Sequence, residues 1–227
     1  MSASEPARPA VLSRIRTALG VRPNDPERQA VVDDRLKRHP RGTIPARALV
    51  DREALLQLFD AMLAGQGAEV TRAATPEEAV RAIADGLRAH DLPLCLRMGD
   101  DALLQSLPWD AVALEQRFGP AEAQDRAAVS RAMTAAAETG TLFLVSGADN
   151  PTTLAFLPES HTILIRADDI VGCYEEAFDR LRAIYGAGTL PRTVNLISGP
   201  SRTADIEQTI VRGAHGPKRL HVVMLDW

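Results

Sequence analysis

Short apolar runs alternate with amphipathic stretches along the chain from residue 51 to its last residues. The run TLFLVS at residues 141–146 is almost wholly apolar, which is typical of a strand that is covered on both faces. Residues 75–90 begin with Thr-Pro-Glu-Glu, a favourable helix start because threonine caps and the acids meet the positive helix end. Such alternation predicts an α/β protein with a mostly parallel sheet and helices on both faces.

The pattern also predicts where the individual elements lie. We expect helices at residues 8–20, 52–66, 75–90, 101–107, 126–138, 168–185 and 203–212, and strands at 68–72, 93–97, 112–115, 141–146, 153–157, 162–167, 193–198 and 220–226. Prolines and polar residues dominate the stretch after the first helix. We therefore expect two parts, an N-terminal helix and extended arm at residues 1–50 and an α/β domain at residues 51–227.

Composition excludes several classes of function. The 227 residues carry a formal net charge of −4, so the chain has no bulk attraction for nucleic acid or an anionic membrane. No run reaches the roughly 18 apolar residues of a membrane span. The N-terminal residues lack the apolar segment of a signal peptide. We expect a cytoplasmic protein without a membrane span.

The residues that usually hold metals or cofactors are sparse. The five histidines show no pair spaced three or four residues apart, and no Walker or dinucleotide-binding glycine motif occurs. Cys95 and Cys173 are far apart, and an iron–sulfur cluster usually needs four thiolates. We predict no metal site and no cofactor, with both cysteines acting as small apolar fillers.

One candidate site begins at Ser198, at the end of the strand expected at 193–198, and leads into the helix expected at 203–212. A helix entrance presents backbone N–H groups to anions, and an arginine adds a planar donor fork. The opposite interpretation is an ordinary capped helix with an arginine in solvent. A lone loop histidine such as His215 is more often a residue that hydrogen-bonds within a turn. The candidate residues for binding a small carboxylate or phosphate are Ser198, Gly199, Ser201, Arg202, Thr203 and His215.

The second candidate is Glu138, in the triplet Glu-Thr-Gly that leads into the run at 141–146. If it ends the helix expected at 126–138, its negative charge opposes the helix dipole. A functional glutamate there acts as a nucleophile or general base. The alternative is a hydrogen-bonded carboxylate that holds the following turn.

Three segments together resemble the lactate-utilisation protein C family, which contains a LUD domain. They are AETGTLFLVS at 137–146, LPESHTILIRADDIV at 157–171 and ISGPSRTADIEQTIVRGAHGPKRLHVVMLD at 197–226. The resemblance implies the NagB/RpiA/CoA-transferase-like fold, the fold of sugar-phosphate isomerases and CoA-transferases. It also implies a role in oxidising L-lactate to pyruvate beside partner subunits that carry iron–sulfur clusters.

Two functions are consistent with this resemblance. In the first, the chain is an accessory subunit of the lactate-oxidising system and holds no cluster itself. In the second, it is a CoA-transferase-like enzyme or anion-binding protein, because Glu138-Thr139-Gly140 resembles the triplet that supplies the acyl-accepting glutamate in that fold relative.

Overall fold

The computed structural model describes residues 7–186, 188–206, 209–213 and 215–227, with residues 203–212 described by their backbone only. The chain divides into two compact units, Met1–Gly42 and Thr43–Trp227, whereas the sequence suggested a division at residue 50. The first unit contains α1 (Ala7–Leu19) and α2 (Pro26–Arg38). Asp25 begins α2, because its side chain accepts hydrogen bonds from the N–H groups of Glu27 and Arg28.

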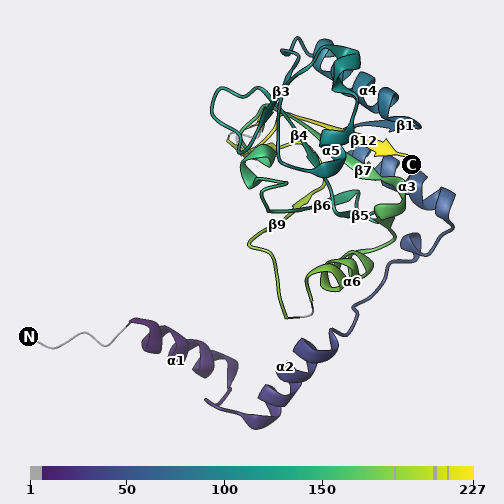
Figure 1. Ribbon diagram of the computed structural model, residues 1–227. Helices are drawn as coiled ribbons and strands as arrows, with labels where there is room; N and C mark the ends of the chain where they lie inside the picture. Colours follow the sequence, from purple (N-terminus) through teal and green to yellow (C-terminus); the bar gives the residue numbers. More distant parts are fainter. Residues whose placement is uncertain (1–6, 187, 207–208, 214) are drawn as a thin grey trace, which may run out of the picture. The chain divides into compact units, whose positions relative to one another are not determined.

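A six-stranded sheet forms the centre of the second unit (Figure 1). All its neighbouring strands are parallel, which confirms the expected mostly parallel sheet. In spatial order the strands are β1 (Glu69–Ala73), β12 (Arg219–Leu225), β7 (Ser160–Arg166), β4 (Ala127–Arg131), β2 (Cys95–Met98) and β3 (Glu115–Phe118).

One face of this sheet is covered by α4 (Pro76–Ala89), α5 (Ala102–Ser106) and the short 3₁₀ helix η2 (Trp109–Val112). Thr75 caps α4 as its sequence suggests, with its Oγ1 accepting from the Glu78 N–H at 3.2 Å. The apolar side of α4 is buried against strand residues such as Val129 and Val223. This packing removes one face of the sheet from water.

The opposite face is covered by α3 (Arg52–Gly65) and by a second, smaller sheet. That sheet has the order β8 (Ile170–Val171), β5 (Thr134–Ala136), β6 (Thr141–Val145) and β9 (Val194–Ile197). Helix α6 (Tyr174–Tyr185) packs on its outer side, where the rings of Phe143 and Phe178 meet edge to face at 5.4 Å. Figure 1 shows β5, β6 and β9 between the main sheet and α6.

The expected helix at 126–138 is wrong, because these residues form β4 and β5. β4 lies in the main sheet between β2 and β7, and its alanines are buried there. Alanine has the highest helix propensity, but propensity is weak beside tertiary packing, so burial between two strands decides the conformation.

The expected helix at 203–212 is also wrong. This segment forms an antiparallel pair, β10 (Arg202–Ile206) and β11 (Thr209–Arg212). The expected strand at 153–157 is wrong, because these residues overlap the 3₁₀ helix η3 (Thr152–Ala155). The strand expected at 112–115 is displaced, because Val112 ends η2 and β3 begins only at Glu115. The shorter 3₁₀ helices are η1 (Ala46–Ala48) and η4 (Ala167–Asp169).

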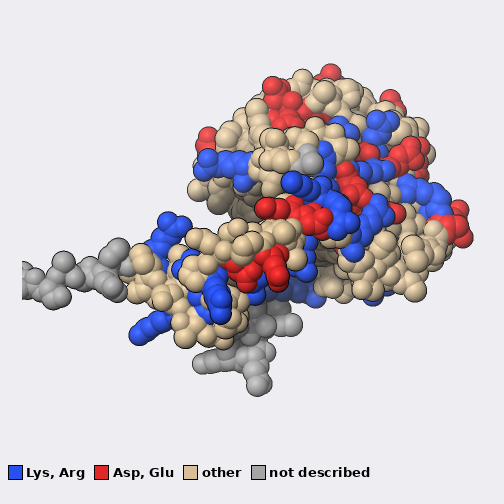
Figure 2. Space-filling model, turned by 90° about the horizontal axis from the view of Figure 1, so that it is seen from below, with Lys and Arg blue, Asp and Glu red and all other residues tan. Residues whose placement is uncertain are grey.

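The surface charge and the helices indicate whether the protein can bind nucleic acid or cross a membrane. On the face of the molecule drawn in Figure 2, acidic and basic side chains are interspersed, so that face has no single-sign field of the kind that attracts nucleic acid. Among the described helices, none combines the length and the apolar character that crossing a bilayer requires.

Candidate functional site

The carboxyl ends of β2, β4 and β7 lie side by side at one edge of the main sheet. Asp101 follows β2, Arg131 ends β4, and Asp169 follows β7 in η4. Ligands of parallel α/β sheets bind outside the carboxyl ends of the strands. This edge is therefore the first place to look for a site.

A cavity of about 290 Å³ opens at this edge, and we call it the Arg131 pocket. Its size is near the lower limit of small-molecule sites, so it suits a small metabolite. Its lining comes from the strand ends, from the loop after β6 and from the end of α6. The lining residues are Asp101, Arg131, Met133, Val145, Asp149, Asn150, Asp169, Ile184 and Tyr185.

Close backbone packing holds the loop after β6 against the end of β2. A side chain at Gly99 would place its Cβ 2.0 Å from the carbonyl oxygen of Asp149, so glycine is required there. The Asp100 N–H donates to the Ala148 carbonyl at 3.1 Å, and the Asn150 amide nitrogen donates to the Val145 carbonyl at 3.0 Å. These contacts place Asp149 and Asn150 in the pocket wall.

Arg131 is the principal cationic group of the pocket. Its Nε is buried and has no hydrogen-bond partner in the part of the chain that the structure describes. Its terminal nitrogens lie 3.8 Å from Asp101 Oδ2 and 3.8 Å from Asp169 Oδ2, which is too long for hydrogen bonds. Because these terminal nitrogens form no hydrogen bond with the described residues, the guanidinium has donor capacity that a ligand can use.

The pocket therefore presents one donor fork with carboxylates on both sides of it. A guanidinium recognises a planar carboxylate through paired N–H groups. The neighbouring carboxylates accept hydrogen bonds from hydroxyl or ammonium groups. The arrangement suits a small molecule that carries a carboxylate and a donor group.

The ligand-binding residues predicted from the sequence do not lie together in the structure. Ser198 Oγ lies 2.7 Å from Thr141 Oγ1, whereas Gly199 lies against Gln66 and the Arg202 guanidinium lies against Gly67, both just beyond α3. For Thr203 only the backbone is described, in β10. The segment does not open a helix, so the helix-entrance argument for this site is wrong, and anion binding by these residues stays a prediction.

Ser201 and His215 do come together, beside a second cavity. The His215 N–H lies 3.4 Å from Ser201 Oγ, and the Ser201 N–H donates to the Pro217 carbonyl at 2.8 Å. The cavity measures about 470 Å³ and is lined by Phe156, Leu157, Pro158, Glu159, Gly213, His215, Gly216 and Lys218. We call it the His215 hollow.

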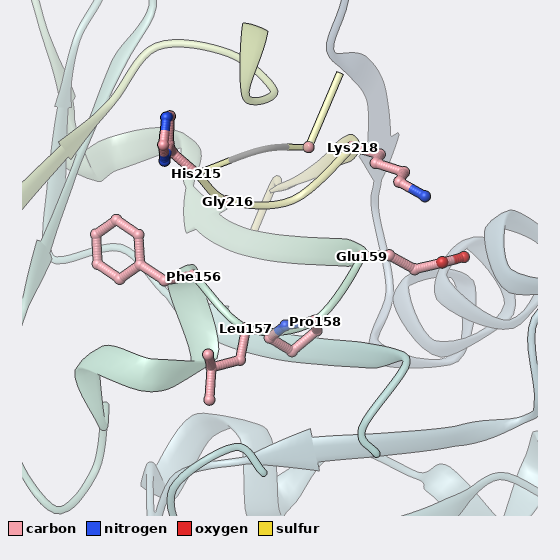
Figure 3. A pocket seen from close by; sticks show the side chains of 8 residues that line it. Phe156, Leu157, Pro158, Glu159, His215, Gly216 and Lys218 are labelled. Carbon is pink, nitrogen blue, oxygen red and sulfur yellow. The ribbon is translucent and has the colours of Figure 1, made fainter. Parts of the chain in front are cut away.

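The His215 hollow lies next to the amino ends of β7 and β12, opposite the edge where parallel sheets bind ligands. Phe156 and His215 lie on one side of it, while Glu159 and Lys218 extend to the other (Figure 3). Glu159 Oε1 is already engaged by Arg126 at 2.8 Å and by Arg219 at 3.1 Å, and the hydrogen bond from Arg126 lowers the pKa of that carboxyl group. We therefore favour the Arg131 pocket as the site.

Glu138 lies in the turn between β5 and β6 and not at a helix end, so the helix-dipole argument for it is wrong. Its side chain is 6% exposed, and Oε1 accepts a hydrogen bond from the Tyr174 N–H at 2.8 Å. Tyr174 is the first residue of α6, and the preceding Cys173 provides no side-chain cap. Glu138 thus caps α6 from a distant part of the chain, and its predicted catalytic role stays a prediction.

Replacing Glu138 with alanine is expected to lower the free energy of unfolding by about 1–2 kcal/mol, because the Tyr174 N–H loses its acceptor. Glutamine at this position keeps an acceptor oxygen and should lose less than half as much. Urea unfolding of the two variants measures the difference. Equal losses for alanine and glutamine would contradict the capping role.

Arg131, Asp101 and Asp169 were not predicted from the sequence as site residues. Arg131 was hidden because its segment was assigned to a helix. The sequence feature that indicates this site is a pair of acidic residues shortly after a strand. It occurs twice, as Asp100-Asp101 after β2 and as Asp168-Asp169 after β7. Among the described residues no group of three or more His, Cys, Asp or Glu side chains is arranged to hold a metal ion, and Cys95 and Cys173 are free thiols.

Known proteins with similar sequences assign this architecture to a family. Residues 56–225 match the family model of the LUD domain. The chain is 36% identical over 90 residues to lactate utilization protein C of Shouchella clausii, which covers 40% of this chain and 39% of that protein. It is 29% identical over 189 residues to lactate utilization protein C of Deinococcus radiodurans, covering 80% of this chain and 84% of that protein.

The chain thus matches well under half of the length of the Shouchella protein. A crystal structure of a DUF162-family protein from Deinococcus radiodurans superposes with a TM-score of 0.61 at 22% identity, covering 78% of this chain and 99% of that one. This likeness supports the fold. Since the family model spans most of the second unit, the resemblance noted from the sequence is confirmed, and the chain belongs to the LUD-domain family.

Proposed function

We propose that this chain is an accessory subunit of an L-lactate-oxidising system in the cytoplasm, and that it binds a small carboxylate in the Arg131 pocket. Partner subunits supply the iron–sulfur clusters. The proposal draws its metabolic context from the relatives named lactate utilization protein C. The chain contains two cysteines, fewer than the four thiolates that usually hold one cluster.

The observation that carries the ligand-binding part is the Arg131 guanidinium, which lines the pocket and whose terminal nitrogens have no hydrogen-bond partner among the described residues. An anionic group of a ligand accepts hydrogen bonds from these terminal nitrogens directly. L-lactate is small enough for a cavity of about 290 Å³ and carries one carboxylate and one hydroxyl.

A growth experiment tests the proposal. Deleting the gene in its own organism should impair growth on L-lactate as carbon source, and the wild-type gene should restore growth. Arg131→Gln should fail to restore growth although the protein accumulates normally. Arg81→Gln, an exposed position on α4, is the matched control and should restore growth. Undiminished growth of the deletion strain on L-lactate would contradict the proposal.

CoA-transferase-like chemistry at Glu138 receives less support. A carboxylate nucleophile must reach the thioester carbon of its substrate. The Glu138 side chain is nearly buried, and one of its oxygens is held by the Tyr174 N–H. This alternative predicts covalent labelling by acyl-CoA, which borohydride trapping detects, and which Glu138→Ala abolishes.

A further inference from the structure

The two carboxylates beside Arg131 each have one oxygen engaged by the protein and one facing Arg131. Asp101 Oδ1 accepts hydrogen bonds from the N–H groups of Leu103 at 2.9 Å and Leu104 at 3.0 Å, which begins α5. Its Oδ2 lies 3.8 Å from Arg131 Nη1. The side chain is 12% exposed, so the position of this oxygen is set by the fold.

Asp169 repeats this arrangement on the other side. Its Oδ1 accepts a hydrogen bond from Arg180 Nη1 at 3.2 Å, which ties η4 to α6. Its Oδ2 lies 3.8 Å from Arg131 Nη2. Among the described residues, no hydrogen bond to Asp101 Oδ2 or Asp169 Oδ2 is formed, so both oxygens keep acceptor capacity beside the cavity.

Ionised carboxylates accept hydrogen bonds and cannot donate them. A ligand whose carboxylate binds Arg131 therefore meets acceptors on both sides of the guanidinium. A hydroxyl or ammonium group on the adjacent carbon satisfies these acceptors. A ligand with a carbonyl oxygen at that carbon would place this acceptor against the acceptor oxygens of the aspartates. A ligand with a CH₂ group there would leave the aspartate oxygens without a hydrogen-bond partner.

The net negative charge of the pocket lining also favours a ligand that carries a donor group. Three acids line the cavity, Asp101, Asp149 and Asp169, whereas Arg131 is the one described cation in the lining. A simple anion without a donor group is disfavoured in such surroundings, because like charges repel at short range. The donor group must therefore contribute to binding together with the carboxylate.

We propose that the Arg131 pocket selects small carboxylates that carry a hydrogen-bond donor at C2, a 2-hydroxy or 2-amino acid, and discriminates against 2-oxo acids. This selectivity rests on the proposed function, since it concerns the same pocket. Its consequence is directional: the pocket retains the alcohol and releases the ketone that oxidation of the alcohol forms.

Four ligands with one three-carbon skeleton test the selectivity by calorimetry on the full chain. L-lactate, L-alanine, pyruvate and propionate differ only in the group at C2. We expect L-lactate and L-alanine to bind at least about tenfold more tightly than pyruvate and propionate, the effect of leaving buried acceptors unpaired.

Amide variants provide the matched test of the mechanism. Asp101→Asn keeps an oxygen to cap α5, and Asp169→Asn removes the charge on the other side. Because an amide also donates, either variant should reduce the preference for L-lactate over pyruvate to less than about threefold. Asp85→Asn, an exposed charge change on α4, should leave the preference intact.

The outcomes separate the selectivity from the proposed function. Equal affinity for all four ligands, lost in Arg131→Gln, would overturn the selectivity and leave the ligand site standing. Binding of L-alanine without L-lactate would support the donor rule and contradict L-lactate as the ligand. No detectable binding of any of the four would overturn the ligand site and the selectivity together.

Discussion

The Arg131→Gln variant is expected to bind L-lactate about ten- to a hundredfold more weakly than the wild type. A hydrogen bond to a charged group contributes about 1.5–3 kcal/mol, and each 1.4 kcal/mol is a factor of ten in affinity. The loss is reinforced because Asp101 and Asp169 then face the ligand carboxylate without the intervening guanidinium. Calorimetric titration measures the change.

Arg202→Ala is the informative comparison for this result. Arg202 was the cation that the sequence favoured for anion binding, and it lies against Gly67, just beyond α3. We expect L-lactate affinity to be unchanged in Arg202→Ala. Weakened binding in Arg202→Ala with normal binding in Arg131→Gln would move the site to the segment at 198–202.

The second large effect is a loss of stability in acid that originates at His161. This residue lies in β7, is 0% exposed, and has Nε2 2.9 Å from Ser130 Oγ. Its Nδ1 is buried without a hydrogen-bond partner among the described residues. Burial lowers the pKa of His161 to about 3, because the charged imidazolium loses its hydration.

The direction of the pH effect follows from this pKa. Between pH 6.5 and 3 the unfolded chain binds a proton at His161 and the folded chain does not, so acid favours unfolding. The stabilisation is complete above pH 6.5 and falls by about 1.4 kcal/mol per pH unit below it. Lowering the pH from 6.5 to 5 should therefore remove about 2 kcal/mol of the free energy of unfolding.

Urea unfolding at pH 7 and pH 5 measures this loss in the wild type and in His161→Gln. Glutamine retains a polar group toward Ser130 and does not titrate, so the variant should be less sensitive to pH by about 2 kcal/mol. A smaller sensitivity remains, because burial also lowers the pKa of His221. Identical pH dependence in the two proteins would show that His161 is not the origin.

Sequence patterns predicted the strands that are buried on both faces. The run at 141–146 forms β6 and the run at 220–226 forms β12. Both runs are apolar along most of their length, so they are stable in a strand that is covered on both faces. Local capping chemistry predicted α4 equally well, since Thr75 and its acidic neighbours act within one turn. These are cases in which local and tertiary preferences agree.

The segment at 126–138 shows where such patterns fail. Its alanines favour a helix locally, but they occupy β4 and β5, where small side chains pack closely against neighbouring elements. That preference was overridden by tertiary contacts with β2 and β7, which come from distant parts of the chain. The wrong assignment concealed Arg131, and with it the pocket.

The functional roles of Glu138 and Ser198 stay predictions, but the structure shows how their positions are related. Both were singled out from the sequence, and the fold connects their neighbourhoods, because Thr141 bonds to Ser198 and to Tyr174, whose N–H bonds to Glu138. The capping contact of Glu138 could not be predicted from the sequence. A carboxylate that caps a helix from 36 residues away leaves no local pattern by which sequence reasoning can recognise it.

A nuclear magnetic resonance titration of the ¹⁵N-labelled chain with L-lactate tests the location of the site most directly. We predict that the side-chain Nε–H signal of Arg131 and the backbone amide signals of Asp101 and Asp169 shift together and saturate with one affinity. Shifts confined to residues 199–202 and 213–218, with the Arg131 signal unmoved, would contradict it.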